Sequence, residues 1–222
     1  MTSRFAGIVA LLFAATVHAQ DSGPYIGASV GQSRAKLDTA ALDGQLTGNH
    51  TPVTVTEDHD TGGKLFFGYR INQYFAVEGG YADLGQFAAT ANDVTQFIHV
   101  IGSVSTPVTI LTPENFTIKV KGVFLSGLGG IPFLQRGLVY AKLGVHDMKV
   151  ELTPDISCGP NCPENQPRSN TSVGPVYGAG VQYTRASHVG IRAEWERFGK
   201  AGGDSTGKHD FDFFTVGLFF HL

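Results

Sequence analysis

Sulfur-containing residues and long apolar runs are both scarce in this sequence. Its 222 residues include only 2 Cys and 2 Met. Cys158 and Cys162 are separated by three residues, one more than in a redox motif, and lie in a Pro- and Asn-rich stretch from Thr153 to Ser172. No further metal ligands stand out beside them. In an exported protein we interpret the two cysteines as a local disulfide.

Only one long apolar run occurs, from Phe5 to Val17, directly after Arg4. It is shorter than the roughly 20 residues that a transmembrane helix needs, and Val17-His18-Ala19 matches a small-x-small cleavage site. We therefore predict a secretory signal peptide at residues 1–19. No transmembrane helix is expected in the remainder, and residues 20–222 suit one domain.

An excess of positive charge is also missing. The chain has 19 Asp and Glu against 16 Lys and Arg, a net charge of −3. No basic stripe could neutralise phosphates, so we expect no nucleic-acid partner. From Leu84 to Ile118 there is no Lys or Arg, while Thr95–Leu111 is rich in Val, Ile, Thr and Phe.

Alternation of apolar and polar residues with a period of two dominates the rest of the chain. It is clearest in Gly63–Tyr81, where two alternating runs flank a short turn at Ile71–Tyr74. Such a pattern predicts an antiparallel hairpin. Further strands are predicted at Tyr25–Ser33, Phe116–Leu128, Leu138–His146, Val176–Thr184, Val189–Phe198 and Phe213–Leu222. Together they predict an all-β, eight-stranded antiparallel up-and-down barrel.

The connections between these strands alternate in length. Short turns are expected at Ile71–Tyr74, Gly129–Arg136 and Arg185–His188. Long loops are expected at Arg34–Gly62, Leu84–Asn115, Asp147–Pro175 and Gly199–Asp212. Loops this long are uncommon in compact soluble domains. Short periplasmic turns and long extracellular loops are typical of outer-membrane barrels.

The outward aromatic residues are expected to form two girdles if the chain starts in the periplasm. The periplasmic girdle would contain Tyr69, Phe75, Tyr183 and Phe220, and the other Tyr81, Phe116, Tyr177, Trp195 and Phe214. Five charged residues should point inward at mid-depth as an ionic network: Glu78, Lys121, Lys142, Arg192 and Glu194. The strand Phe116–Leu128 fits least well, because Val123 and Leu125 fall on its charged face; a bulge would explain this.

Five segments carry a resemblance to a known family. They are Tyr25–Gly31, Gly68–Gly85, Tyr140–Gly144, Tyr177–Tyr183 and Arg192–Phe198. In this order the chain resembles the OmpA-type eight-stranded outer-membrane barrels of Gram-negative bacteria, which implies that fold and location. Two features depart from the family. The sequence ends in Leu222 rather than an aromatic residue, and we expect no peptidoglycan-binding domain after the last strand.

Two short motifs match functional patterns. Gly27-Ala-Ser-Val-Gly31 fits the G-x-S-x-G nucleophile pattern, but that pattern needs a strand-to-helix elbow and it lies along a predicted strand. Glu57–Asp60 is dense in charge and is interpreted as a solvated loop rather than a cation site. We therefore assign no catalytic residue, cofactor or metal.

The expected function is a structural or adhesin-like role at the outer membrane, with the lumen plugged by the ionic network. Two alternatives stay open: an outer-membrane enzyme acting on lipid A or peptides, and a periplasmic lipocalin-like barrel with its apolar faces inward. We expect a monomer in contact with membrane lipids and lipopolysaccharide. The barrel-assembly machinery should read Phe213–Leu222. The loop Leu84–Asn115 should form a hairpin turning near Ser103–Pro107, and it is a candidate surface for a protein partner.

Overall fold

The computed structural model describes residues 22–37, 39–43, 51–101, 104–134, 136–156, 167–185, 188–203 and 206–222. Within these ranges the elements are β1 (Gly23–Lys36), α1 (Thr39–Asp43), β2 (Thr54–Glu57), β3 (His59–Arg70), β4 (Phe75–Ile101), β5 (Val104–Phe133), β6 (Gly137–Ile156), β7 (Arg168–Thr184), β8 (Val189–Gly203) and β9 (Gly207–His221). No helix among these residues is long and apolar enough to cross a membrane.

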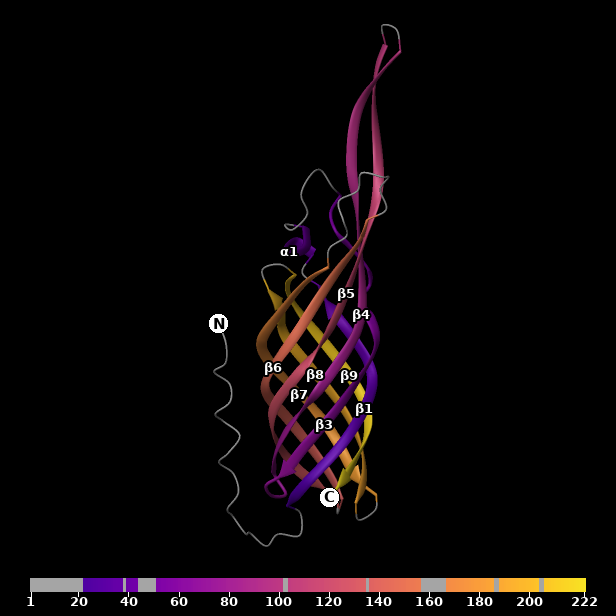
Figure 1. Ribbon diagram of the computed structural model, residues 1–222. Coiled ribbons are helices and arrows are strands. Elements are labelled where there is room, and N and C mark those ends of the chain that lie inside the picture. The colour runs from indigo at the N-terminus through magenta and orange to yellow at the C-terminus, as the bar shows by residue number, and fades with distance from the viewer. Residues whose placement is uncertain are drawn as a thin grey trace, which may run out of the picture.

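Eight of the strands close into a barrel. Their order around it is β4-β3-β1-β9-β8-β7-β6-β5, and β5 pairs with β4 to complete the circle. Every pairing is antiparallel, and the short strand β2 adds only to β4. The short turns lie at the end of the barrel where β1 begins and β9 ends (Figure 1). The predicted eight-stranded antiparallel barrel is confirmed.

The outer wall of the barrel is apolar and the inside is charged. Side chains such as Leu143, Val216 and Leu218 are more than half exposed on the outer face. Lys64 and Glu78, by contrast, are buried inside it. A lipocalin-like barrel would have the opposite arrangement, so that alternative is wrong.

Most strands are longer than predicted, because strand pairing continues into segments that we expected to be loops. β4 and β5 pair without a further break from Gln86 and Lys119 up to Ile101 and Val104. They form a hairpin that projects far beyond the rest of the barrel (Figure 1). The predicted hairpin is confirmed, but its last pair is Ile101 with Val104, so Val104–Pro107 belong to β5 and not to the turn as expected.

The inside of the barrel changes character along its axis. Toward the short turns it holds the buried charges described below. Toward the long loops it is packed with apolar side chains, including Phe87, Ile118, Val150, Phe198 and Phe211. These residues belong to five different strands, so the upper part of the barrel has the interior of a soluble β protein.

The alternation in β5 runs opposite to our assignment for its upper half. β5 pairs with β6 without a register shift from Glu114 to Phe133, so the strand contains no bulge and its two faces stay constant. Val123 and Leu125 are exposed on the outer wall, and Lys121 lies on that same face. The prediction that Lys121 joins the lumen network is wrong. Phe116, only 8% exposed, packs inside, so its assignment to a girdle is wrong as well.

The bulge expected in this strand occurs instead in its neighbour β4. The β4–β5 register shifts between Asp83 and Gln86, where Gly85 has a φ of +85°. Asp83 Oδ1 accepts the Gly85 N–H at 3.0 Å. This extra residue brings both Leu84 and Phe87 to the inside.

The remaining girdle residues lie on the outer wall. Seven are at least 38% exposed: Tyr69, Phe75, Tyr81, Tyr177, Tyr183, Phe214 and Phe220. Trp195 is half-buried against the ring of Tyr177, with 6.2 Å between ring centroids.

Candidate functional site

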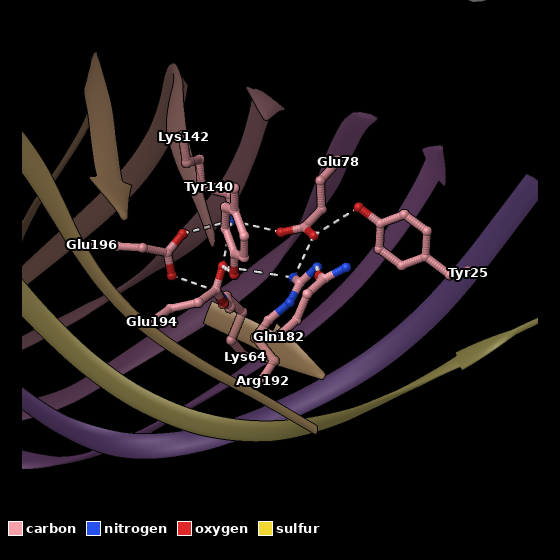
Figure 2. A network of polar contacts seen from close by, with 9 residues as sticks. All are labelled: Tyr25, Lys64, Glu78, Tyr140, Lys142, Gln182, Arg192, Glu194 and Glu196. Carbon is pink, nitrogen blue, oxygen red and sulfur yellow. Dashed lines mark hydrogen bonds and ion pairs between the residues drawn. The ribbon is translucent and has the colours of Figure 1, made fainter. Parts of the chain in front are cut away.

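The most distinctive polar feature of the molecule is a cluster of charged side chains enclosed by the barrel (Figure 2). It contains three cations and three carboxylates: Lys64, Lys142, Arg192, Glu78, Glu194 and Glu196. β3, β4, β6 and β8 supply them, and all six are at most 5% exposed. We call these six residues the lumen network.

Glu78 forms one centre of the lumen network. Its Oε1 accepts a hydrogen bond from Lys142 Nζ at 2.6 Å, and its Oε2 accepts one from Arg192 Nη1 at 2.5 Å. The Tyr25 hydroxyl donates to the same Oε2 at 3.1 Å. Arg192 is held from its other side, because its Nη2 donates to Gln182 Oε1 at 3.0 Å.

Glu194 and Glu196 form the second centre. Lys64 Nζ donates to Glu194 Oε2 at 2.6 Å and also to Glu196 Oε2. Lys142 Nζ donates to Glu196 Oε1 at 2.7 Å, which links this centre to Glu78. The Tyr140 hydroxyl donates to Glu194 Oε1 at 2.7 Å. Every carboxylate therefore has at least two donors, as buried charges require.

Aromatic rings surround the cations. The Arg192 guanidinium lies 4.5 Å from the ring centroid of Phe66, and Lys142 Nζ lies 4.8 Å from that of Phe124. These rings exclude water and their faces attract the positive charge. Burying an ion costs several kcal/mol, so this arrangement is stable only because each charge is both paired and hydrogen-bonded.

Glycines make room for the two tyrosines of the cluster. The Tyr25 ring packs directly on Gly68, and a Cβ at Gly180 would lie 2.5 Å from the Tyr140 hydroxyl oxygen. These glycines accommodate the rings that donate hydrogen bonds to Glu78 and Glu194.

Four of the five residues predicted for the lumen lie together: Glu78, Lys142, Arg192 and Glu194. The sequence reasoning missed Lys64 and Glu196. Both fall on the inward face of their strands by simple alternation, so the signal was present. They were left out because they do not lie at mid-depth along the strand, whereas long side chains reach along the barrel axis as well as across it.

The other sequence motifs do not form a functional site among the described residues. Cys158 and Cys162 lie outside the described residues, as does the predicted signal peptide. Ser29, within Gly27–Gly31, is buried on a regular strand and not at an elbow. Asp58, from the Glu57–Asp60 run, accepts hydrogen bonds from His59 and Arg34, which lower the pKa of its carboxyl.

A closed barrel with an apolar outer wall and a polar interior is the architecture of a transmembrane β-barrel. The sequence profile of the OmpA-like transmembrane domain matches residues 19–222, and the chain belongs to that family. It is an outer-membrane protein of a Gram-negative bacterium, embedded in outer-membrane lipid. Its short turns face the periplasm and its long loops face the exterior.

Curated relatives resemble the chain in sequence, and a solved structure shares its fold. Outer membrane protein A of Escherichia fergusonii is 28% identical over 187 residues, which cover 84% of this chain and 44% of the relative. The Shigella flexneri protein is 25% identical with the same coverage. The chain thus spans less than half the length of these relatives. Neisserial surface protein A (NspA) shares the fold, with a TM-score of 0.50 and 14% identity over 90% of this chain and 98% of that one.

Proposed function

We propose that this protein is a non-catalytic, monomeric barrel with a lumen closed by the lumen network and a surface-interaction role carried by the β4–β5 hairpin. The observation that carries the first part is the charge balance in the lumen. Three cations and three carboxylates lie within hydrogen-bonding distance of one another and are almost wholly buried. An ion crossing the barrel would have to displace them, and the apolar packing above them offers no wet path.

Planar-bilayer recording of the folded monomer tests the closed lumen. We expect only small and intermittent current steps. Steady conductance of the size seen with porins would contradict the proposal. A double variant, Lys64→Ala with Lys142→Ala, should raise the frequency of current steps, because it removes side chains from the lumen and leaves carboxylates that attract cations.

The second part rests on the free edges of the hairpin. On one side the last neighbouring contact is the Thr51 N–H, which donates to the Asn92 carbonyl at 2.8 Å, and on the other the last pair is Glu114 with Ile156. Beyond them, residues 93–101 of β4 and 104–113 of β5 pair with no further strand in the described part of the chain. We therefore propose that each strand has one open edge, where an extended segment of another protein can add a strand.

The two edges are not equivalent. Pro107 and Pro113 interrupt β5, and each lacks the backbone N–H that a ladder needs. Residues 93–101 of β4 contain no proline and only one charged residue, Asp93. We therefore propose the β4 edge as the surface that binds a protein partner.

A variant with a shortened hairpin tests the binding role while it keeps the barrel fold. Replacing residues 93–112 with Asn-Gly keeps the pair Asn92–Pro113 and supplies a two-residue hairpin turn. Both forms, in lipid nanodiscs, would be screened against immobilised extracellular-matrix proteins. We expect the full chain to bind at least one of them and the shortened chain to lose that binding. Equal binding by two folded proteins would contradict the hairpin proposal.

We further propose that the barrel-assembly machinery reads the last strand. The outward residues Phe214, Val216, Leu218 and Phe220 form a continuous apolar face on β9. Phe220→Ala should slow the appearance of the folded, heat-modifiable form in cells. An unchanged rate would assign recognition to another part of the strand.

No catalytic role is part of the proposal. A barrel enzyme acting on lipid A or peptides would need a convergent acid or Ser-His-Asp cluster at the extracellular rim. Incubating the folded protein with lipid A and with peptide libraries, followed by mass spectrometry, should leave both substrates intact. A new product would reverse this part of the proposal.

A further inference from the structure

The three short turns at the periplasmic end of the barrel contain basic side chains and no acidic ones among their described residues. One arginine lies in or directly beside each of the three short turns: Arg70, Arg136 and Arg185. The turn sequences 66–77, 127–141 and 180–191 contain no Asp or Glu. The periplasmic turns are therefore purely cationic, whereas the extracellular end mixes both signs.

Arg136 and Arg185 lie side by side on neighbouring turns. Arg136 Nη1 donates to the Arg185 carbonyl oxygen at 2.8 Å, and the Thr184 N–H donates to the Arg136 carbonyl at 2.9 Å. Both arginines are exposed. Neither forms an ion pair with any carboxylate of the described residues. Most of their guanidinium donors are thus free for a ligand.

Arg70 differs from these two. Its side chain lines a small cavity at the mouth of the barrel, together with Tyr25 and Gln182. It adds positive potential to this end of the barrel but does not belong to the exposed pair.

The arginine pair lies at the border of the apolar wall. Ile131 and Leu134, which precede Arg136, are 75% and 79% exposed. Val139 pairs with Ile131 on one side and with Val181 on the other, so the lipid-facing surface begins within one turn of the arginines. The exposed ring of Tyr183 lies in the same band. This height corresponds to the headgroups of the periplasmic leaflet.

We propose that Arg136 and Arg185 bind the phosphate of an anionic phospholipid in the periplasmic leaflet of the outer membrane. Guanidinium groups present planar, paired donors that match phosphate oxygens. The apolar side chains of Ile131 and Leu134 contact the acyl region, which anchors the lipid on the side away from water. The site gives the barrel a fixed depth in the leaflet as well as a bound lipid.

Native mass spectrometry of the folded barrel tests this site. The protein would be released from mixed micelles containing phosphatidylglycerol and phosphatidylcholine, and the retained lipid would be counted. We expect phosphatidylglycerol to be retained preferentially. Arg136→Gln with Arg185→Gln should lower its retention about thirtyfold, since each of the two basic residues at an anionic surface contributes about 1 kcal/mol and every 1.4 kcal/mol is a factor of ten. Arg136→Lys with Arg185→Lys should give an intermediate value, because the charge stays but the paired donors are lost.

The matched control is Lys119→Gln with Lys121→Gln, which removes one exposed and one half-buried charge from the outer face, away from the periplasmic turns. This variant should retain phosphatidylglycerol like the unmodified protein. An equal loss in both double variants would indicate unspecific charge attraction and overturn the site. Unchanged retention in a heat-modifiable Arg136→Gln, Arg185→Gln protein would also overturn it. Complete displacement by inorganic phosphate would show an anion site without lipid preference, which contradicts the lipid assignment.

Discussion

Arg192 and Glu78 meet across the full width of the barrel. Their closest atoms, Nη1 and Oε2, are 2.5 Å apart. In the circle of eight strands, β8 and β4 are separated by three strands in either direction, so they stand opposite each other. This contact braces the barrel internally, and its removal gives the sharpest test of the lumen network.

Arg192→Ala should lower the free energy of unfolding by about 3–5 kcal/mol, the cost of removing one partner of a buried ion pair, because Glu78 then keeps only one of its two cations. Lys121→Ala, on the outer face, should change it by less than about 0.5 kcal/mol. Urea unfolding in lipid vesicles, followed by heat-modifiability on gels, measures both. Similar losses of unfolding free energy in the two variants would show that the buried contact does not stabilise the barrel more than an outer-face side chain does.

Gly180→Ala should destabilise the barrel by about 1–3 kcal/mol, because the added methyl group displaces the Tyr140 hydroxyl from Glu194. Gly127→Ala is the matched control, since the nearest atom to its new Cβ, the Leu143 carbonyl oxygen, would be 3.9 Å away. The same unfolding assay compares them. If Gly180→Ala were as stable as the control, the close packing of Tyr140 would be refuted.

Leu218→Arg should cost about 2–4 kcal/mol and impair assembly, because Leu218 lies on the outer wall between Phe214 and Phe220. Gln32 is exposed and pairs with Phe214. Gln32→Arg should therefore lower the stability by no more than about 1 kcal/mol. The yield of the heat-modifiable form reports on both. Equal yields would contradict the assignment of the lipid-facing wall. Thr215 cannot serve as a mild inward control, as it is only 3% exposed and packed inside.

Amide exchange should show an alternating pattern along residues 93–101 and 104–113. A hairpin of two strands bonds only every second N–H to its partner and leaves the others facing solvent. Slow exchange is therefore expected at alternate residues, read out by NMR of the barrel in micelles. Uniformly fast exchange would show that the strands are not paired in solution, while uniform protection would indicate that the edges are covered.

Alternation alone determined much of this protein. It identified the strands, the outward position of most girdle residues and four members of the lumen network. Charged residues in mid-strand opposite a bulky apolar face carry enough information for this, because within a bilayer the apolar face must point outward.

Only the tertiary structure showed how far along each strand the apolar face points outward. In β5, Val123 and Leu125 face outward, yet Ile118 and Val120 of the same unbroken strand face inward. In β9, Phe213 packs inside while Phe214 faces lipid. A period of two defines two faces but does not say which one is inside, and the apolar face changes sides where the surroundings change from lipid to water. The position of this lipid–water boundary along each strand depends on the pairing between distant strands and on the bulge at Gly85. The sequence does not show this position, and Lys121 and Phe116 were therefore placed on the wrong face.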